Sequence, residues 1–198
     1  CAYYLLTISD RYFIKEILNL EELAYYSVAA HFAGAVYIIQ SIFSTIWPTF
    51  IYKCYEKSSN DLYKLMIESV SRLLIVVIAY IWALIGVGSF LIGLVLPESY
   101  MSVVNVLPVL VAIPLISLLT EVTAVGINLE KKTYFHSIIT ILCLVINLIG
   151  NALLIPIMGI QGAAYATLIS YLLYFVLKTE TSIKLGIKVN RYVLYGVI

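Results

Sequence analysis

One acidic side chain lies in the middle of a long uncharged stretch of this chain. Glu121 is the only charged residue between positions 101 and 129, and Lys131 follows it by ten residues. In a helix this spacing places Glu121 about 15 Å from the basic end of the stretch, near a membrane midplane. A charge at that depth is costly, so it faces a bundle interior or an aqueous cavity. We expect a cavity or ion-coupling role, or else a protonated Glu121 that hydrogen-bonds a neighbouring helix for packing alone.

Two prolines precede this acid in the same stretch. Pro108 and Pro114 each remove one backbone hydrogen bond from a helix. Broken helices close to a buried acid are typical of transporters. We therefore expect an interrupted helix on the way to Glu121.

A second group of charges surrounds the turn at residues 19–22. Asp10 and His31 lie at similar distances on either side of it, so two antiparallel helices would hold them at comparable depth. A carboxylate beside an imidazole is suited to proton coupling. Arg11 and Lys15 share a helical face and could contact a phosphate or an acidic sugar. The alternative is that these charges form a solvated helix end.

Amide side chains form a further polar feature. Four residues at positions i, i+3, i+7 and i+11 share one helix face: Thr140, Cys143, Asn147 and Asn151. Such a stripe either lines a polar wall or joins neighbouring helices through hydrogen bonds. Gln40, on another uncharged stretch, is a weaker candidate of the same kind.

The composition indicates which elements must position these residues. Of the 198 residues, 63% are hydrophobic and 12% are charged, and the mean hydropathy is +1.02. Soluble domains have about 45–50% apolar and 25% charged residues, so a soluble globule is excluded. The net charge of +1 offers no basic face for nucleic acid. The three cysteines have no metal or disulfide spacing, and no phosphate-binding glycine loop or nucleophile motif is present, so we expect no cofactor, no metal and no enzyme activity.

Uncharged stretches of about 20 residues predict an all-α integral membrane protein, a polytopic bundle with five complete transmembrane helices and partial helices at both ends. The expected helices are about 1–18, 23–52, 73–96, 101–129, 133–157, 161–178 and 189–198. Lys and Arg alternate between the loops, with four at 53–72, two at 130–132 and four at 178–191, against none at 97–100 and 156–162. The positive-inside rule therefore predicts that the three basic loops are cytoplasmic.

Two stretches resemble the polysaccharide-biosynthesis flippases, the O-antigen family of the multidrug, oligosaccharidyl-lipid and polysaccharide exporter superfamily. Residues 9–34, SDRYFIKEILNLEELAYYSVAAHFAG, are similar to the family's Asp-Arg helix end, acidic turn and Gly-x-Tyr-Ser-x-Ala helix start, with Ala24 in place of the glycine. Residues 146–171, INLIGNALLIPIMGIQGAAYATLISY, are similar to its Asn-x3-Asn, Ile-Pro and Gly-Ile-x-Gly-Ala-Ala-x-Ala-Thr pattern.

The resemblance implies that residues 1–198 are the C-terminal lobe of a two-lobe transporter, a fragment whose N-terminal lobe supplies half of the cavity. Its expected cargo is an undecaprenyl-pyrophosphate-linked oligosaccharide, moved by alternating access across the bacterial cytoplasmic (inner) membrane for O-antigen, capsule or exopolysaccharide synthesis. The coupling ion would be H⁺ or Na⁺. The expected cavity residues are Asp10, Arg11, His31, Gln40, Glu121, Asn147 and Asn151.

Three other functions are compatible with the same helices. A multidrug or cation antiporter of this superfamily would share the architecture but would present more carboxylates to cationic drugs. A glycan polymerase or ligase would need a large external loop, and the expected external loops are short. A purely structural membrane subunit would have little use for charges at several depths.

Overall fold

The computed structural model describes residues 2–57, 62–95 and 101–186. The helices in these residues are α1 (Ala2–Ile17), α2 (Leu20–Lys57), α3 (Leu62–Val95), α4 (Met101–Thr123), α5 (Val125–Leu129), α6 (Tyr134–Met158) and α7 (Ile160–Lys184). Five of them, α2, α3, α4, α6 and α7, are long and apolar enough to cross a membrane. The predicted all-α polytopic membrane bundle is therefore confirmed, and the expected helix at 189–198 lies outside the described residues.

The helices α2 and α3 extend into the segment that the charge pattern assigned to a loop. We expected a loop over 53–72, but α2 continues to Lys57 and α3 begins at Leu62. The extra turns form because they carry apolar residues on one face. Tyr63 and Ile67 are buried and pack in a small core with Trp47 and Ile51 of α2. Of the charged residues described in this segment, Lys53 and Glu56 therefore lie in the last turns of α2, and Lys64, Glu68 and Arg72 in the first three turns of α3.

The expected interruption before Glu121 does not occur. The helix α4 runs continuously through Pro108 and Pro114, and the chain breaks helix only at Ala124, before the short α5. Both prolines lie in a helix that is surrounded by α2, α3 and α7. Packing against neighbouring helices holds a transmembrane helix together where proline removes a backbone hydrogen bond.

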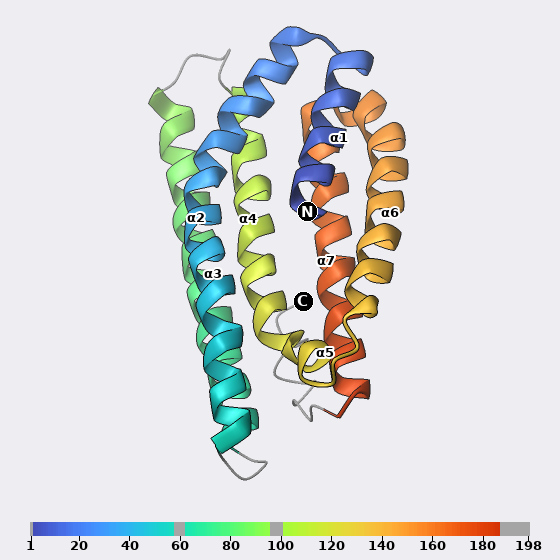
Figure 1. Ribbon diagram of the computed structural model, residues 1–198. Helices are drawn as coiled ribbons and strands as arrows, with labels where there is room; N and C mark the ends of the chain where they lie inside the picture. The colour runs from blue at the N-terminus through green and yellow to red at the C-terminus, as the bar shows by residue number, and fades with distance from the viewer. Residues whose placement is uncertain (1, 58–61, 96–100, 187–198) are drawn as a thin grey trace.

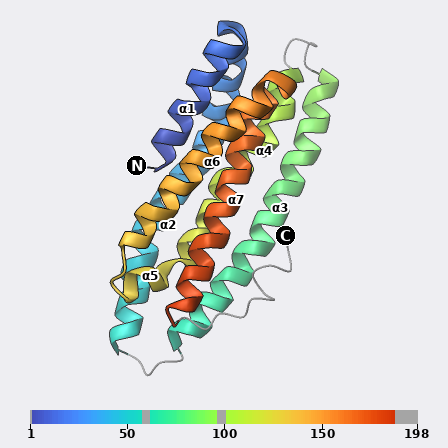
Figure 2. The ribbon, with the colours of Figure 1, turned by 90° about the vertical axis from the view of Figure 1, so that its right-hand side faces the viewer.

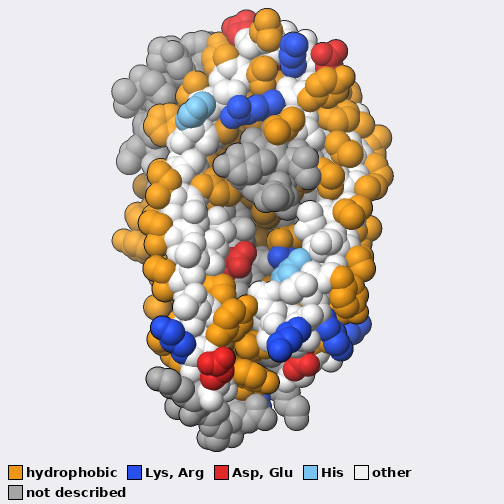
Figure 3. Space-filling view, in the orientation of Figure 1, with side chains coloured by type: hydrophobic (Ala, Val, Ile, Leu, Met, Phe, Trp, Pro, Cys, Tyr) orange, Lys and Arg blue, Asp and Glu red, His pale blue; other side chains and the backbone are white. Residues whose placement is uncertain are grey.

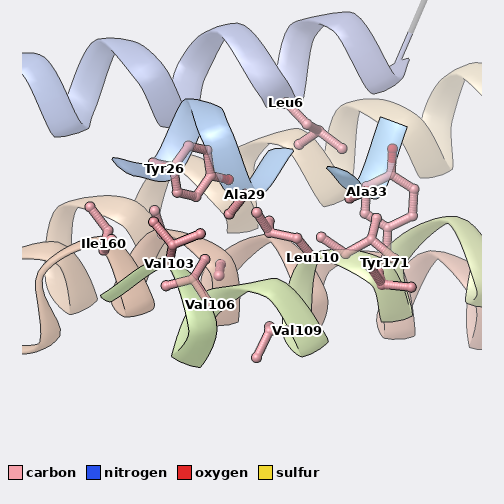
Figure 4. Packing of buried hydrophobic residues seen from close by; sticks show 14 of the residues in the cluster. Leu6, Tyr26, Ala29, Ala33, Val103, Val106, Val109, Leu110, Ile160 and Tyr171 are labelled. Carbon is pink, nitrogen blue, oxygen red and sulfur yellow. The ribbon is translucent and has the colours of Figure 1, made fainter. Parts of the chain in front are cut away.

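The helix α4 is the central element of the bundle. It packs against α2 and α3 on one side and α7 on the other, while α6 pairs with α7 and α1 lies on α6 (Figures 1 and 2). The main apolar core lies among these helices and includes Tyr26, Val106 and Tyr171 (Figure 4). In the most apolar window of α4, 72% of residues are buried, against 11% in α2 and in α3. The outward faces of α2 and α3 are thus the faces available to lipid, and Figure 3 shows apolar side chains along both flanks.

The basic segments gather at one end of the bundle. The C-terminal ends of α2 and α7 lie at the same end as α5, and the α1–α2 and α6–α7 turns lie at the other (Figure 1). This arrangement agrees with the alternation of Lys and Arg along the chain, because each spanning helix carries the chain to the opposite end.

A tight hairpin joins α6 to α7 and brings the two helices into close contact. Gly159 adopts φ +61°, a backbone conformation that favours glycine, and ends α6. Gly162 lies so close to α6 that an added Cβ would collide with the Leu154 carbonyl oxygen and lie 2.8 Å from the Ile155 nitrogen. The obstacle is backbone, so it cannot move aside without shifting a helix.

We predict that Gly162→Ala lowers the free energy of unfolding by about 1–3 kcal/mol, because the methyl group forces α6 and α7 apart. The measurement is the thermal unfolding midpoint of the full-length protein in detergent. Gly34→Ala is the matched control, since nothing lies within 4 Å of its added Cβ. Equal midpoints for the two variants would contradict the close contact.

Candidate functional site

A buried carboxylate lies where four helices meet. Asp10 of α1 is 1% exposed. Its Oδ2 accepts hydrogen bonds from the Tyr26 hydroxyl at 2.9 Å and the Thr167 hydroxyl at 2.7 Å. Its Oδ1 accepts from the Asn151 amide at 2.7 Å and the Asn147 amide at 3.4 Å. These donors come from α2, α7 and α6, and together the five residues are called the Asp10 cluster below.

The donors of this cluster are also bonded to one another. The Asn147 amide donates to the Thr167 hydroxyl at 2.9 Å. The Asn147 carbonyl oxygen accepts from Ser9 at 2.8 Å and from the Asn151 amide at 3.3 Å. One oxygen stands apart, because Asn151 Oδ1 is buried and has no hydrogen-bond partner in the described part of the chain.

The Asp10 carboxylate has no cationic partner among the described residues. The interactions that surround it are hydrogen bonds from neutral hydroxyl and amide groups. A buried carboxylate without a cationic partner is expensive even when it accepts several neutral hydrogen bonds. The cluster is therefore suited to bind a proton or a small cation, which would remove the uncompensated charge.

The predicted pair of Asp10 and His31 does not form. His31 is exposed, and its Nδ1 lies 2.6 Å from the Ser27 carbonyl oxygen of its own helix. The residue of α2 that reaches Asp10 is Tyr26. Five positions separate Tyr26 from His31, which is about 140° around a helix, so the two cannot face the same neighbour. The face of α2 on which a residue lies decides the contact.

Arg11 is likewise outside the cluster. It follows Asp10 in α1 and is exposed, as is Lys15. Adjacent helical residues point about 100° apart, so the burial of Asp10 directs Arg11 away from the core. The structure thus separates the predicted candidates, and it brings Asp10 together with Asn147 and Asn151 alone.

Two further candidates, Gln40 and Glu121, line a cavity in the adjoining part of the bundle. The cavity has a volume of about 220 Å³ and its walls come from α1, α2, α4, α6 and α7. Its lining includes Gln40, Ser117, Glu121, Thr140, Cys143, Ser170, Tyr171 and Tyr174. Figure 3 shows a hollow in this face with acidic, basic and histidine colours inside it. The predicted polar stripe on α6 therefore contributes to both sites. Thr140 and Cys143 line the cavity, and Asn147 and Asn151 bind Asp10.

Lys178 is a functional candidate that sequence reasoning missed. We placed it at the boundary between the predicted helix 161–178 and a cytoplasmic loop, but it lies within α7, is 6% exposed, and its Nζ is 4.2 Å from the centre of the Tyr174 ring. The helix α7 packs against α4, which carries Glu121. The signal was its position four residues after Tyr174, on the face that lines the cavity.

Tyr26 and Thr167 were also missed as site residues, although both lie in the two stretches that resemble the flippases. Hydroxyl groups on transmembrane helices are too common for their positions alone to indicate a site. In the described residues no three His, Cys, Asp or Glu side chains come together as a metal site. No family model, curated protein or solved structure matches this chain.

We predict that Thr167→Val lowers the free energy of unfolding by about 1–3 kcal/mol, because it removes a donor to a buried carboxylate at constant volume. Thr181→Val is the control on the same helix, since the Thr181 hydroxyl donates only to the Leu177 carbonyl of its own turn, at 2.7 Å. Thermal unfolding of the full-length protein in detergent measures both. An equal loss of unfolding free energy in Thr181→Val and Thr167→Val would show that the hydrogen bond to Asp10 does not cause the loss.

Proposed function

We propose that this chain is one lobe of a flippase that moves undecaprenyl-pyrophosphate-linked oligosaccharides across the bacterial cytoplasmic membrane by alternating access. One observation carries the proposal. The two stretches that resemble the flippase family converge on the Asp10 cluster, although Asp10 and Asn151 are 141 positions apart. Asp10 and Tyr26 come from residues 9–34, and the remaining members from residues 146–171. Motifs that were recognised separately thus supply one site.

The cavity supports the transport of a polar cargo. A glycan cannot enter hydrocarbon without losing its hydrogen bonds to water, so it needs a polar path through the membrane. Glu121, Gln40 and several hydroxyl groups line such a surface within the bundle. Ligand sites have volumes of about 300–1,000 Å³, and this cavity of about 220 Å³ is smaller. It therefore serves as one wall of a larger chamber whose other wall is the N-terminal lobe.

The Asp10 cluster supplies the coupling to an ion gradient. A proton or Na⁺ at Asp10 removes an uncompensated charge from the bundle interior. The oxygen atoms that Na⁺ could use at this site are those of the carboxylate and the Thr167 hydroxyl, and the unpartnered Asn151 Oδ1 belongs to the same cluster. Because the donors belong to α2, α6 and α7, a change of charge at Asp10 alters the contacts between these helices. A ligand that distinguishes two helix arrangements shifts their populations, which is the requirement for coupled transport.

One observation favours a second candidate, a multidrug or cation antiporter. The carboxyl group of Glu121 faces the cavity, where it would attract a cationic drug. Glu121 is, however, the one carboxyl group among the described residues that line the cavity, and its other lining groups are hydroxyl, amide, thiol and apolar. A site for cationic drugs would present more carboxylates, so we favour a glycan carried on a lipid diphosphate over a cationic cargo.

Asp10→Asn is expected to reduce surface glycan about tenfold or more, since the amide keeps the volume of Asp10 but cannot bind a proton or cation as a carboxylate does. The test uses the full-length protein in a strain whose surface glycan depends on it. Glycan is measured on gels and protein amount by immunoblot. His31→Gln, at an exposed residue outside the cluster, should leave export unchanged. Normal export by Asp10→Asn at normal protein amount would exclude the coupling role.

Glu121→Gln tests the cavity and separates the two candidates. We expect about a tenfold loss of glycan export, because the one carboxyl group among the described residues of the cavity lining is removed, and no change in the resistance of the cells to cationic drugs. Export and drug susceptibility are measured side by side at several external pH values. Drug resistance that requires Glu121, together with full glycan export at every pH, would support the antiporter instead.

A further inference from the structure

Two spaces lie one after the other along the bundle. The first is the cavity of about 220 Å³ that Glu121 lines. The second is a narrow pocket of about 20 Å³, called the void below, that lies against Asp10 and Thr167 and has walls from α1, α2, α4 and α7. A void needs about 10–15 Å³ to hold one water molecule. The second space is therefore large enough for one water molecule but too small for a hydrated ion.

The helix register orders these two spaces. On each of three helices, residues three or four positions apart share a face and pass from the void to the cavity. The series are Ala33, Tyr37 and Gln40 on α2, Ile113, Ser117 and Glu121 on α4, and Thr167, Tyr171 and Tyr174 on α7. Only Tyr37 and Tyr171, the middle members on α2 and α7, line both spaces.

Tyr37 and Tyr171 have large side chains, whereas two residues of α2 that line the void beside Asp10 are small. Ala30 and Ala33 form the wall of α2 beside Asp10, and the Tyr37 ring follows one turn later. Figure 4 shows Tyr171 beside Ala33, at the opposite end of the cluster from Tyr26, which bonds to Asp10. The contents of the cavity therefore meet two aromatic rings before they reach the carboxylate.

We propose that Tyr37 and Tyr171 form a partition between the cavity and Asp10, and that movement of these rings admits a water molecule, a proton or one small dehydrated cation to the carboxylate. The role in coupling rests on the proposed function, but the partition itself does not. Glu121 lies on the cavity side, where its carboxyl group attracts cations to the entrance. The partition excludes the glycan and its diphosphate from the ion site, because neither fits in a void of about 20 Å³.

Cysteine labelling tests the partition without transport. Cys143 lines the cavity and Ala33 lines the void, and both are 2% exposed, so they make a matched pair of reporters. One full-length variant carries Cys1→Ser and Cys54→Ser and keeps Cys143. A second also carries Cys143→Ala and Ala33→Cys. Both are treated in membranes with the water-soluble cation 2-aminoethyl methanethiosulfonate, and mass spectrometry measures the labelling rates. We expect position 33 to react at least about tenfold more slowly than Cys143, a barrier difference of about 1.4 kcal/mol.

Removing a ring should open the void. We expect Tyr37→Ala and Tyr171→Ala each to raise the rate at position 33 about tenfold, with less than about a twofold change at Cys143. Gln40→Ala is the control one turn away on the cavity side and should leave position 33 unchanged. Tyr37→Phe keeps the ring and should also leave it unchanged. Gel filtration identifies variants that do not fold, and Tyr37→Leu replaces Tyr37→Ala if that variant fails.

Equal rates at position 33 and Cys143 in the parent protein would overturn the partition. So would an equal effect of Gln40→Ala and Tyr37→Ala at position 33. Labelling needs neither cargo nor a second lobe in a particular state. A negative labelling result would therefore reject the partition without rejecting the proposed glycan export. Conversely, a negative export result would not change the expected labelling rates.

Discussion

The structure depends on the burial of one carboxylate without a counter-charge. In a low-dielectric interior, Asp10 is tolerable only if its oxygens accept several well-placed hydrogen bonds or take up a positive charge. The chain meets the first requirement with donors from α2, α6 and α7. Four helices that could otherwise slide along one another are thereby held in one register. The close approach of α6 and α7 at Gly162 belongs to the same arrangement, because it brings Asn151 and Thr167 to the same carboxylate.

The packing of the helices and the proposed ion binding involve the same side chains at this site. An interhelical hydrogen bond in a membrane contributes modestly to stability, so a network of neutral groups would join the helices adequately. In the proposed function, the ionisable group at its centre would add a dependence on a proton or cation. The pocket of Asp10 and the cavity of Glu121 share walls on α1, α2, α4 and α7, and these helices would connect the carboxylate with the surface that the proposed cargo contacts.

Local features of the chain predicted most of the fold and part of the site. A transmembrane helix satisfies its backbone hydrogen bonds within its own segment. Each of the five spans could therefore be predicted from its own residues alone. The segment at 53–72 was misassigned because charge was taken as a sign of a loop, whereas Tyr63 and Ile67 bury one face of a helix there. The charge of Lys178 was likewise taken to mark the start of a loop. Its Nζ lies over the ring of Tyr174, one turn earlier on the same helix, and the side chain is buried there.

The sequence by itself determined the helical membrane architecture and the shared face of Asn147 and Asn151, whereas the depth of Glu121 was estimated for one helix through residue 129 and α4 ends at Thr123. The architecture and the shared face follow from position along one helix and rotation about its axis. Only the tertiary structure decided that Tyr26 rather than His31 meets Asp10, that Thr167 completes the cluster, and that Glu121 belongs to a separate cavity. The physical reason is that the rotation of each helix relative to its neighbours is set by the packing of all of them together, which no single stretch of residues contains.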